Sequence, residues 1–349
     1  MISLKCLKRI LLEIGGGRQL TEILKKIEKI IYGIKRVSNN RRVIVAFSGG
    51  LDSTVALNLA KLAIGRNRVI AANVDFGPYT YKKARENVVN LSKSLGVKLL
   101  QIPGASQQLS LIKHGPDCNL CTKRIKLGLI KFHSKGKIII TGSNQSDSWG
   151  SYGHKLCDGY YSPLFEYTKE DINAIAEYLN INIKRIGENV FREGCKLKHL
   201  LKPNVNSDYH GKAVCEANEF LLEKLKKAGI DAKIANVKII GPLIKNIALL
   251  NIYPLPDASD HLDQLNKICT DIKKITTIEE SIIVNQPMEL VIRANKSQFN
   301  NLRSRYWLEK GRLQPEFAFP VKIKWLLTTN RNLKTFQVIS YNYISKNEL

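Results

Sequence analysis

The residues best suited to chemistry form a short loop between two segments of opposite character. Residues 43–47 are apolar throughout and predict a buried strand, whereas residues 54–63 have the spacing of a helix. The loop that joins them reads Ser48, Gly49, Gly50, Leu51, Asp52 and Ser53. Two glycines let backbone amides approach an anion closely, and the following helix adds its positive dipole end. We therefore expect a phosphate site with Ser48, Ser53 and Thr54 as hydroxyl donors; a glycine turn capped by serine is the alternative.

A second group of reactive residues is the pair Cys118 and Cys121, which two residues separate. Six basic and no acidic residues lie between Cys118 and Ile140. Nearby cations and helix-end amides favour the thiolate, which is the form that binds metals or attacks. The chain has seven cysteines, and residues 1–14 do not have the pattern of an export signal. We therefore expect free thiols that are reactive or bind a metal, and not a disulfide scaffold.

The elements that position these residues alternate between strands and helices. The predicted strands cover residues 43–47, 69–74, 97–102 and 137–141, and the predicted helices cover 54–63, 82–95, 122–133 and 169–179. Near-continuous apolar strands joined by helices predict an α/β fold with a doubly wound parallel sheet that helices cover on both faces. Ligands of such sheets bind at the carboxyl ends of the strands, which is where the glycine loop falls.

The pattern changes after about Pro203 to that of an α+β domain. Strands are expected near residues 237–240, 248–252, 281–284, 289–294 and 321–325, and helices near 213–228 and 260–273. We expect three parts: an N-terminal helical segment over residues 1–40, a sheet domain over 41–204, and a C-terminal α+β domain over 205–349. A chain of 349 residues is long enough for this division.

The sheet domain resembles the PP-loop ATPase superfamily, whose Ser-Gly-Gly-x-Asp-Ser signature the loop matches at every position. Further matches follow in the expected order. Asp75 ends the second strand, where this superfamily commonly carries an acidic residue. The segment from Thr141 to Asp147 resembles Thr-Gly-His-x-x-Asp-Asp, with Ser143 in place of the histidine, and Ser162-Pro163-Leu164 followed by residues 169–172 resembles Arg-Pro-Leu with Lys-x-Glu-Ile.

This resemblance implies a HUP-like fold and chemistry on ATP. A substrate oxygen attacks the α-phosphorus, pyrophosphate leaves with Mg²⁺, and the adenylated oxygen is displaced by nitrogen or sulfur. Asp52 would hold Mg²⁺ or position the phosphates, with Asp147 a weaker candidate for the same cation. The implied ATP-binding residues are Ser48, Gly49, Gly50, Asp52, Ser53, Thr54, Asp75, Gly142 and Asp147.

The cysteines resemble those of tRNA-thiolating PP-loop enzymes, in which three cysteines hold an iron-sulfur cluster that binds sulfur. The implied ligands are Cys118, Cys121 and Cys195, with Cys157 in reserve, and Cys121 and Cys195 are the implied catalytic thiols. Three alternatives stay open. A zinc ion could be bound by the same cysteines with His199, one thiol of a redox pair could carry a persulfide, or the thiols could be inert.

Charge points to a polyanionic partner. The chain has 55 basic and 30 acidic residues, a net charge of +25, and residues 286–349 alternate basic and aromatic side chains in 303–307 and 322–325. We expect tRNA as partner, because phosphates and unpaired bases bind such groups. A solvated basic face with core aromatics, or pairing of two copies as in PP-loop enzymes that make GMP, would explain the same pattern. No segment has the apolar length of a membrane span, and a cytoplasmic location is expected.

These observations favour a tRNA sulfurtransferase that adenylates a base carbonyl and receives sulfur from a donor protein or sulfide. The first alternative is an ATP-dependent ligase or amidotransferase acting on a small molecule, in which the cysteines bind zinc. The second is an RNA-binding protein with a vestigial nucleotide fold, which the intact loop disfavours.

Overall fold

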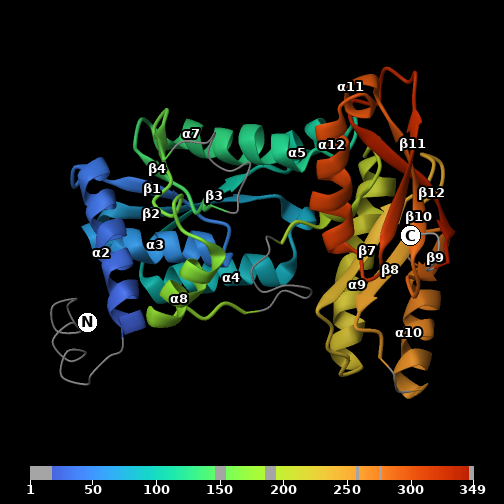
Figure 1. Ribbon diagram of the computed structural model, residues 1–349, viewed down its shortest axis with the longest axis horizontal. Helices are drawn as coiled ribbons and strands as arrows, with labels where there is room; N and C mark the ends of the chain where they lie inside the picture. The colour runs from blue at the N-terminus through green and yellow to red at the C-terminus, as the bar shows by residue number, and fades with distance from the viewer. Residues whose placement is uncertain (1–17, 146–154, 185–193, 257–258, 275–276, 346–349) are drawn as a thin grey trace. The chain divides into compact units, whose positions relative to one another are not determined.

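The computed structural model describes residues 18–145, 155–184, 194–256, 259–274 and 277–345 (Figure 1). The chain divides into two compact units. The first consists of residues 1–74, 86–102 and 127–184, and the second of residues 75–85, 103–126 and 185–349. No helix among the described residues is long and apolar enough to span a lipid bilayer.

The first unit is built on a six-stranded sheet with the order β3-β2-β1-β4-β6-β5. Its strands are β1 (Val43–Ala46), β2 (Val69–Asp75), β3 (Lys98–Pro103), β4 (Ile139–Ile140), β5 (Leu156–Cys157) and β6 (Tyr160–Tyr161). The pairs β1–β2, β1–β4 and β4–β6 are parallel, and the edge strand β5 pairs antiparallel with β6. The expected α/β fold with a mostly parallel sheet is confirmed.

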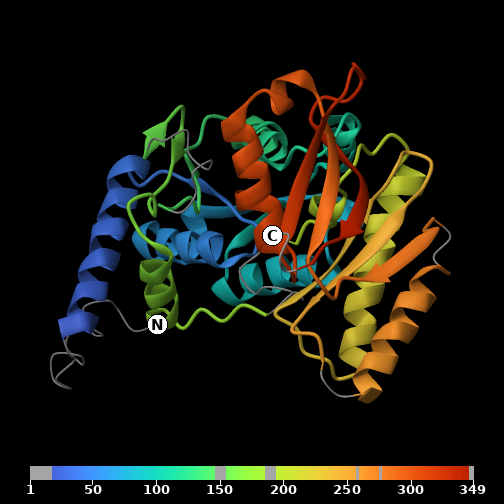
Figure 2. The same ribbon diagram turned by 45° about the vertical axis from the view of Figure 1, so that its right-hand side comes forward.

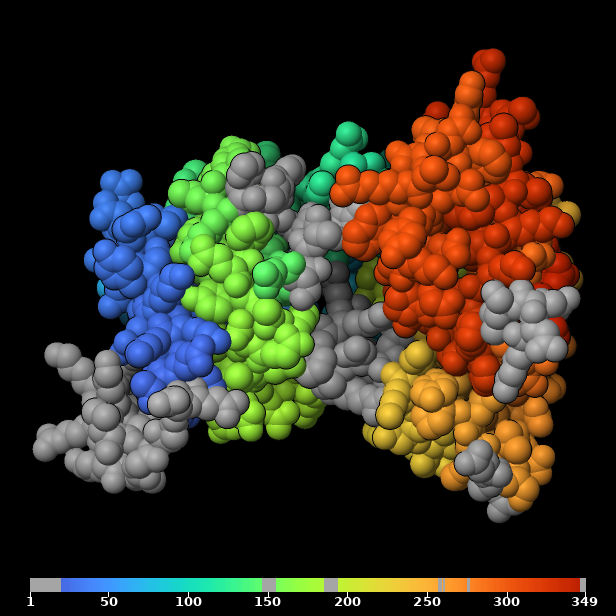
Figure 3. Space-filling view, viewed as in Figure 1, coloured from blue at the N-terminus to red at the C-terminus, as the bar shows by residue number. Residues whose placement is uncertain are grey.

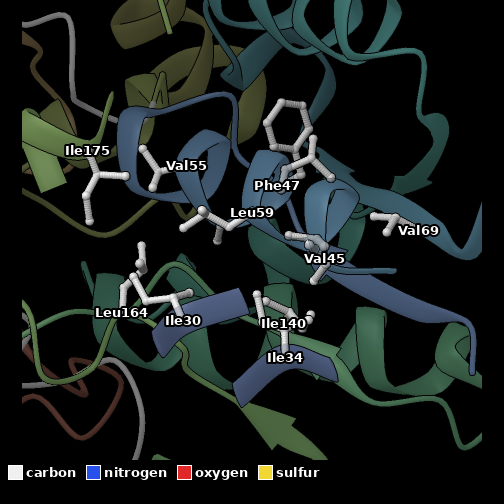
Figure 4. Close-up of a cluster of buried hydrophobic side chains, with 14 of the residues drawn as sticks. Ile30, Ile34, Val45, Phe47, Val55, Leu59, Val69, Ile140, Leu164 and Ile175 are labelled. Atoms are coloured by element: carbon white, nitrogen blue, oxygen red, sulfur yellow. The ribbon is translucent and has the colours of Figure 1, made fainter. Parts of the chain in front are cut away.

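Helices cover both faces of this sheet because its central strands are apolar on both sides. One face packs against α2 (Arg18–Ser38), α3 (Leu51–Ile64) and α8 (Lys169–Tyr178), around the buried cluster that contains Val45, Val55 and Ile175 (Figure 4). The other face packs against α7 (Gly128–Ser134), which contributes Ile130 to a second cluster with Ile44 and Ile139. The unit therefore has a doubly wound core.

The strand order reverses between β1 and β4. From β1 the chain moves outward to β2 and β3, through α4 (Lys82–Leu95), and then returns to β4 on the opposite side of β1. Loops that leave the carboxyl ends of two neighbouring strands diverge at such a reversal, and they form the crevice in which ligands of open α/β sheets bind. The loops after β1 and β4 therefore define the candidate site.

The second unit contains two three-stranded sheets, with the orders β7-β8-β9 and β11-β10-β12. Their strands are β7 (Ile234–Ile240), β8 (Ile247–Tyr253), β9 (Glu280–Ile283), β10 (Met288–Ala294), β11 (Val321–Leu327) and β12 (Phe336–Tyr343). Helices α9 (Lys212–Lys227) and α10 (Ser259–Ile272) lie along the first sheet (Figure 2). This unit has the α+β character that the sequence predicted.

Short elements complete the chain. They are the helical turns η1 (Arg66–Arg68), η2 (Gly77–Tyr79), α6 (Cys118–Leu120), η4 (Lys196–His199), α11 (Lys296–Phe299), α12 (Leu302–Tyr306) and η7 (Gln314–Glu316), the helix α5 (Ala105–Ile112), and the π-helices η3 (Cys121–Leu127), η5 (Ser207–Gly211) and η6 (Trp307–Leu313). The helix expected over residues 122–133 begins as the π-helix η3 and continues as α7. Strand β12, α5 and the helical segment 296–316 were not predicted.

Candidate active site

The loop after β1 has the backbone that a phosphate site requires. Gly49 has a φ of 78°, a left-handed conformation that strains other residues, and a Cβ there would lie 2.9 Å from a methyl of Val88. Gly50 is the N-cap of α3, so the first amides of this helix follow directly. The sequence folds this way because the apolar strand ends at Ala46 and two glycines permit the sharp turn into α3.

Hydroxyl groups hold the loop in shape from within. The Ser53 hydroxyl donates to the carbonyl of Gly50 at 3.0 Å, and the Thr54 hydroxyl donates to the same carbonyl at 2.8 Å. Ser48 and Ser53 bring their hydroxyl oxygens to 3.1 Å, and the amide of Gly50 donates to the Ser48 hydroxyl. These three side chains therefore order the loop, and a role as phosphate donors stays a prediction.

Asp52 has two carboxylate oxygens in different surroundings. Its Oδ2 accepts hydrogen bonds from Lys169 and, at 3.2 Å, from the side-chain amide of Asn144. Its Oδ1 is buried and has no hydrogen-bond partner among the described residues. A buried carboxylate oxygen without a donor is costly unless a cation or a ligand binds there. The geometry of Asp52 therefore fits the binding of Mg²⁺ through Oδ1.

The loop after β4 packs directly on the start of α3. A Cβ added to Gly142 would lie 2.7 Å from the Ser53 amide nitrogen and 2.8 Å from the carbonyl carbon of Asp52. The neighbouring Thr141 hydroxyl lies 2.8 Å from that of Ser162, which fixes this loop against the turn after β6. Only glycine allows so close an approach, so Gly142 sets the distance between the two loops.

The structure adds Asn144 and Lys169 to the predicted site. Both lie in segments that the sequence singled out, but neither was expected to contact Asp52. Lys169 begins α8, whose N-terminus is fixed by a capping box between Thr168 and Asp171. The Lys-x-Glu-Ile resemblance pointed to Lys169 as a residue of interest. A single sequence does not reveal that its side chain reaches the loop after β1.

Of two other predicted residues, the structure describes only Asp75. Asp75 ends β2, and its Oδ1 accepts a hydrogen bond of 3.0 Å from the amide of Gly77, so its carboxylate stabilises the following turn. Its role as a nucleotide ligand stays a prediction. Asp147 lies outside the described residues.

Two cysteines of the second unit contact one glutamine. The buried side-chain amide of Gln108 donates to Cys121 Sγ at 3.6 Å and to Cys195 Sγ at 3.4 Å. Cys121 is buried, and burial raises the pKa of its thiol to about 12. Cys118 is exposed at the start of α6, where Asp117 caps the turn. Gln108 was not predicted, because its position in α5 gives no motif.

The expected three-cysteine metal site is not formed by the described residues. Among them, no three His, Cys, Asp or Glu side chains are arranged to hold a metal ion. Gln108 lies beside the sulfurs of Cys121 and Cys195, and Cys157 belongs to the other unit, at β5. The alternative zinc set with His199 is not formed among these residues either. His199 is fully buried, and its Nδ1 lies 3.0 Å from Nζ of Lys238, which in turn contacts Glu316 at 2.5 Å.

The aromatic side chains of residues 299–325 are mostly packed, and Arg305 packs with two of them. The guanidinium of Arg305 lies between the rings of Phe299 and Trp325, at 5.5 Å and 5.1 Å. Trp307 packs against Gly311, and only Tyr306 of this group has a mostly exposed ring. Their use in RNA binding stays a prediction.

The loop, the sheet order and one family comparison define the class of this protein. The family model for NAD synthase matches residues 23–192. This range contains β1, the glycine loop, Asp52 and the loops after β4 and β6. Together with the ordered motifs, the match supports the assignment of this part of the chain to the PP-loop ATPase superfamily.

Two kinds of relative are similar to this chain. The NH(3)-dependent NAD(+) synthetase of Pyrococcus horikoshii is 27% identical over 167 residues, which cover 45% of this chain and 63% of that protein. The glutamine-hydrolyzing GMP synthase of Lactobacillus acidophilus is 24% identical over 275 residues, which cover 71% of this chain and 52% of that protein. The second match is longer than the family-model match, so it extends beyond residues 23–192. The chain thus spans only part of each relative.

Proposed function

We propose that this chain is an ATP pyrophosphatase that adenylates an oxygen of a small substrate and allows ammonia to displace AMP. The observation that carries the proposal is Asp52, with Oδ2 bound to Lys169 and Asn144 and Oδ1 buried without a donor. The relatives support the nitrogen nucleophile, since one is named for its dependence on NH(3) and the other for hydrolysing glutamine.

In the proposed reaction the substrate oxygen forms a bond to the α-phosphorus of ATP, and the bond from that phosphorus to the bridging oxygen breaks. The amides from Gly49 to Ser53 and the positive end of α3 attract the departing pyrophosphate. Mg²⁺ bound at Oδ1 of Asp52 would neutralise charge on this group. The ammonium group of Lys169 adds a second positive charge at the same place.

The substrate class follows from the products after which the relatives are named. NAD⁺ carries a carboxamide, and GMP carries an exocyclic amine on its base. Both groups arise when ammonia replaces an activated oxygen, of a carboxylate in the first case and of a ring carbonyl in the second. We therefore propose a nucleotide with a carboxylate or a ring carbonyl as the acceptor.

The test is the release of pyrophosphate from ATP with Mg²⁺, ammonium and each candidate acceptor in turn, with mass spectrometry of the product. We expect release that requires the acceptor, with a product in which NH replaces O for a carboxylate or carbonyl. Asp52→Asn should lower the rate by about 100-fold or more, because this is the usual effect of removing one group that stabilises charge in the transition state. The matched control is Asp158→Asn, an exposed aspartate paired with Lys131. Equal rates in the two variants would refute the role of Asp52.

A second candidate function, sulfur transfer to an RNA base, rests on the pair Cys121 and Cys195. Both sulfurs lie within 3.6 Å of one nitrogen, so they are at most about 7 Å apart. One thiol would carry a persulfide sulfur to the adenylated carbon, AMP would leave, and the other thiol would break the sulfur–sulfur bond. The resulting disulfide would need an external thiol reductant. Burial raises the pKa of Cys121, which makes Cys195 the candidate carrier.

The two functions respond differently to the same variants. Asp52→Asn should abolish either reaction. Cys195→Ser should leave ammonia-dependent product formation unchanged and should abolish the appearance of thiolated nucleosides in tRNA incubated with ATP, a persulfide donor and a thiol reductant. A thiolated nucleoside that persists in Cys195→Ser would refute sulfur transfer by this pair.

A further inference from the structure

Three segments of the second unit meet around the connection between β11 and β12. The amide of Lys334 donates to the carbonyl of His114 at 2.8 Å, which joins this connection to the segment after α5. The amide of Asn295 donates to the carbonyl of Thr335 at 3.0 Å, and its side chain donates to the carbonyl of Lys334, which joins the end of β10. Residues distant in the sequence thus form one surface.

The segments that meet here carry five exposed basic side chains, which we call the basic cluster: Lys113, Arg293, Lys296, Arg331 and Lys334. None of them has a carboxylate partner among the described residues, whereas elsewhere in the same unit Lys196, Lys238 and Lys245 are paired with glutamates. The segments that meet here contain no acidic residue at all: residues 105–116, 290–308 and 317–347 have neither Asp nor Glu. Positive charge is therefore segregated at this surface and not merely abundant in the chain.

The connection presents its charges on an ordered backbone. The side chain of Leu333 is 4% exposed and anchors the turn in the core. The amide of Asn330 donates to the Thr328 hydroxyl at 3.2 Å, and the amide of Asn332 donates to the Asn330 side chain at 3.0 Å. The segment projects at the upper edge of the surface in Figure 3. An ordered backbone reduces the entropy that is lost when a ligand binds.

We propose that the basic cluster binds the phosphate backbone of RNA. Five cations without partner carboxylates match a polyanion and not a single phosphate group. The exposed tip between β11 and β12 is formed by Thr329, Asn330 and Asn332, whose hydroxyl and amide groups suit phosphate and ribose oxygens. A membrane-binding surface would place apolar side chains at such a tip. None of these five residues has a role in the proposed reaction, so RNA binding at the basic cluster does not depend on that reaction.

The test uses the full chain and a fluorescently labelled tRNA transcript, with binding measured by anisotropy between about 0.05 and 0.3 M salt. The double variant Arg331→Gln and Lys334→Gln should weaken binding by about tenfold at 0.15 M salt. It should also lower the slope of log Kd against log salt by about 1.5, because each lost phosphate contact removes about 0.7 to 0.9 from that slope.

The matched control is the double variant Lys226→Gln and Lys267→Gln, which removes the same charge from exposed positions on α9 and α10. It should change the slope by much less. Equal slopes in the two double variants would overturn the proposal, and so would binding to phosphatidylglycerol vesicles, but not RNA, that depends on Arg331 and Lys334. Unfolding curves of both variants verify the fold. Pyrophosphate release with a small acceptor should be unchanged, which separates this inference from the proposed reaction.

Discussion

The ammonium group of Lys169 contacts Oδ2 of Asp52 and joins the first turn of α8 to the first turn of α3. These residues are 117 positions apart in the sequence. The contact compensates one half of a partly buried carboxylate and leaves the other oxygen available to a cation. It also places a positive charge beside the glycine loop, which is where the phosphates of a nucleotide are expected.

Removal of this charge should weaken nucleotide binding. We expect Lys169→Met to raise the Kd for ATP and Mg²⁺ by about tenfold, because a charge-assisted contact is lost and Asp52 is left with a single donor. Lys169→Arg should retain most of the affinity, since it keeps the charge. Titration calorimetry measures both. An unchanged Kd in Lys169→Met would show that this lysine stabilises the protein and does not contribute to ATP binding.

The second prediction concerns Gly142, which lies close to the backbone of Asp52 and Ser53. Gly142→Ala should abolish measurable ATP binding, because its Cβ would lie under 3 Å from backbone atoms of Asp52 and Ser53, and backbone atoms cannot rotate away. The control is Gly128→Ala at the start of α7, where a Cβ meets nothing within 4 Å and alanine favours the helix. That variant should bind ATP normally and unfold at the same temperature or slightly higher. Normal binding by Gly142→Ala would contradict the proposed packing of the two loops.

The burial of Lys202 should make the free energy of unfolding depend on pH. Its ammonium group is buried between the carbonyls of Pro242 and Lys245, each at 2.8 Å, and burial lowers its pKa from 10.5 to about 7. Between these values the unfolded chain binds the proton and the folded chain does not, so the free energy of unfolding should rise with pH. Below about pH 7 both states are protonated, and this contribution to the slope disappears.

Chemical unfolding at pH 7, 8 and 9 checks this expectation. Lys202→Met should be less stable throughout, because two carbonyls lose their donor, and its stability should rise less steeply with pH than that of the wild type. The slope from one such group is at most about 1.4 kcal/mol per pH unit. Parallel curves for the two proteins would mean that Lys202 keeps an ordinary pKa in the folded state.

The thiols should differ sharply in reactivity. Burial raises the pKa of Cys121 to about 12, so very little thiolate is present at pH 8, whereas Cys118 is exposed. Brief treatment of the native protein with iodoacetamide at pH 8 should modify Cys118 and leave Cys121 unmodified, and both should react in denaturant. Peptide mass spectrometry provides the measurement. Rapid native modification of Cys121 would contradict its buried position beside Gln108.

The local pattern was sufficient for strands β1 to β4 and for the glycine turn after β1, but not for β5 and β6. An apolar strand, two glycines and a helix determine the turn after β1 by short-range sterics alone, and helix α4 was predicted with its observed bounds. The elements of the C-terminal part were harder to predict from the sequence. Strand β12 lies after a polar turn, and the helical segment 296–316 includes the π-helix η6, so neither has one clear period.

The sequence by itself determined which residues form the turn after β1, because glycine conformations and apolar periodicity act over a few neighbouring positions. Only the tertiary structure decided which distant side chains meet them. Lys169 and Asn144 reach Asp52 because the strand order reverses between β1 and β4, and Gln108 lies between Cys121 and Cys195 because α5 packs there. Such contacts depend on how the elements pack in space, which no spacing in a single chain encodes.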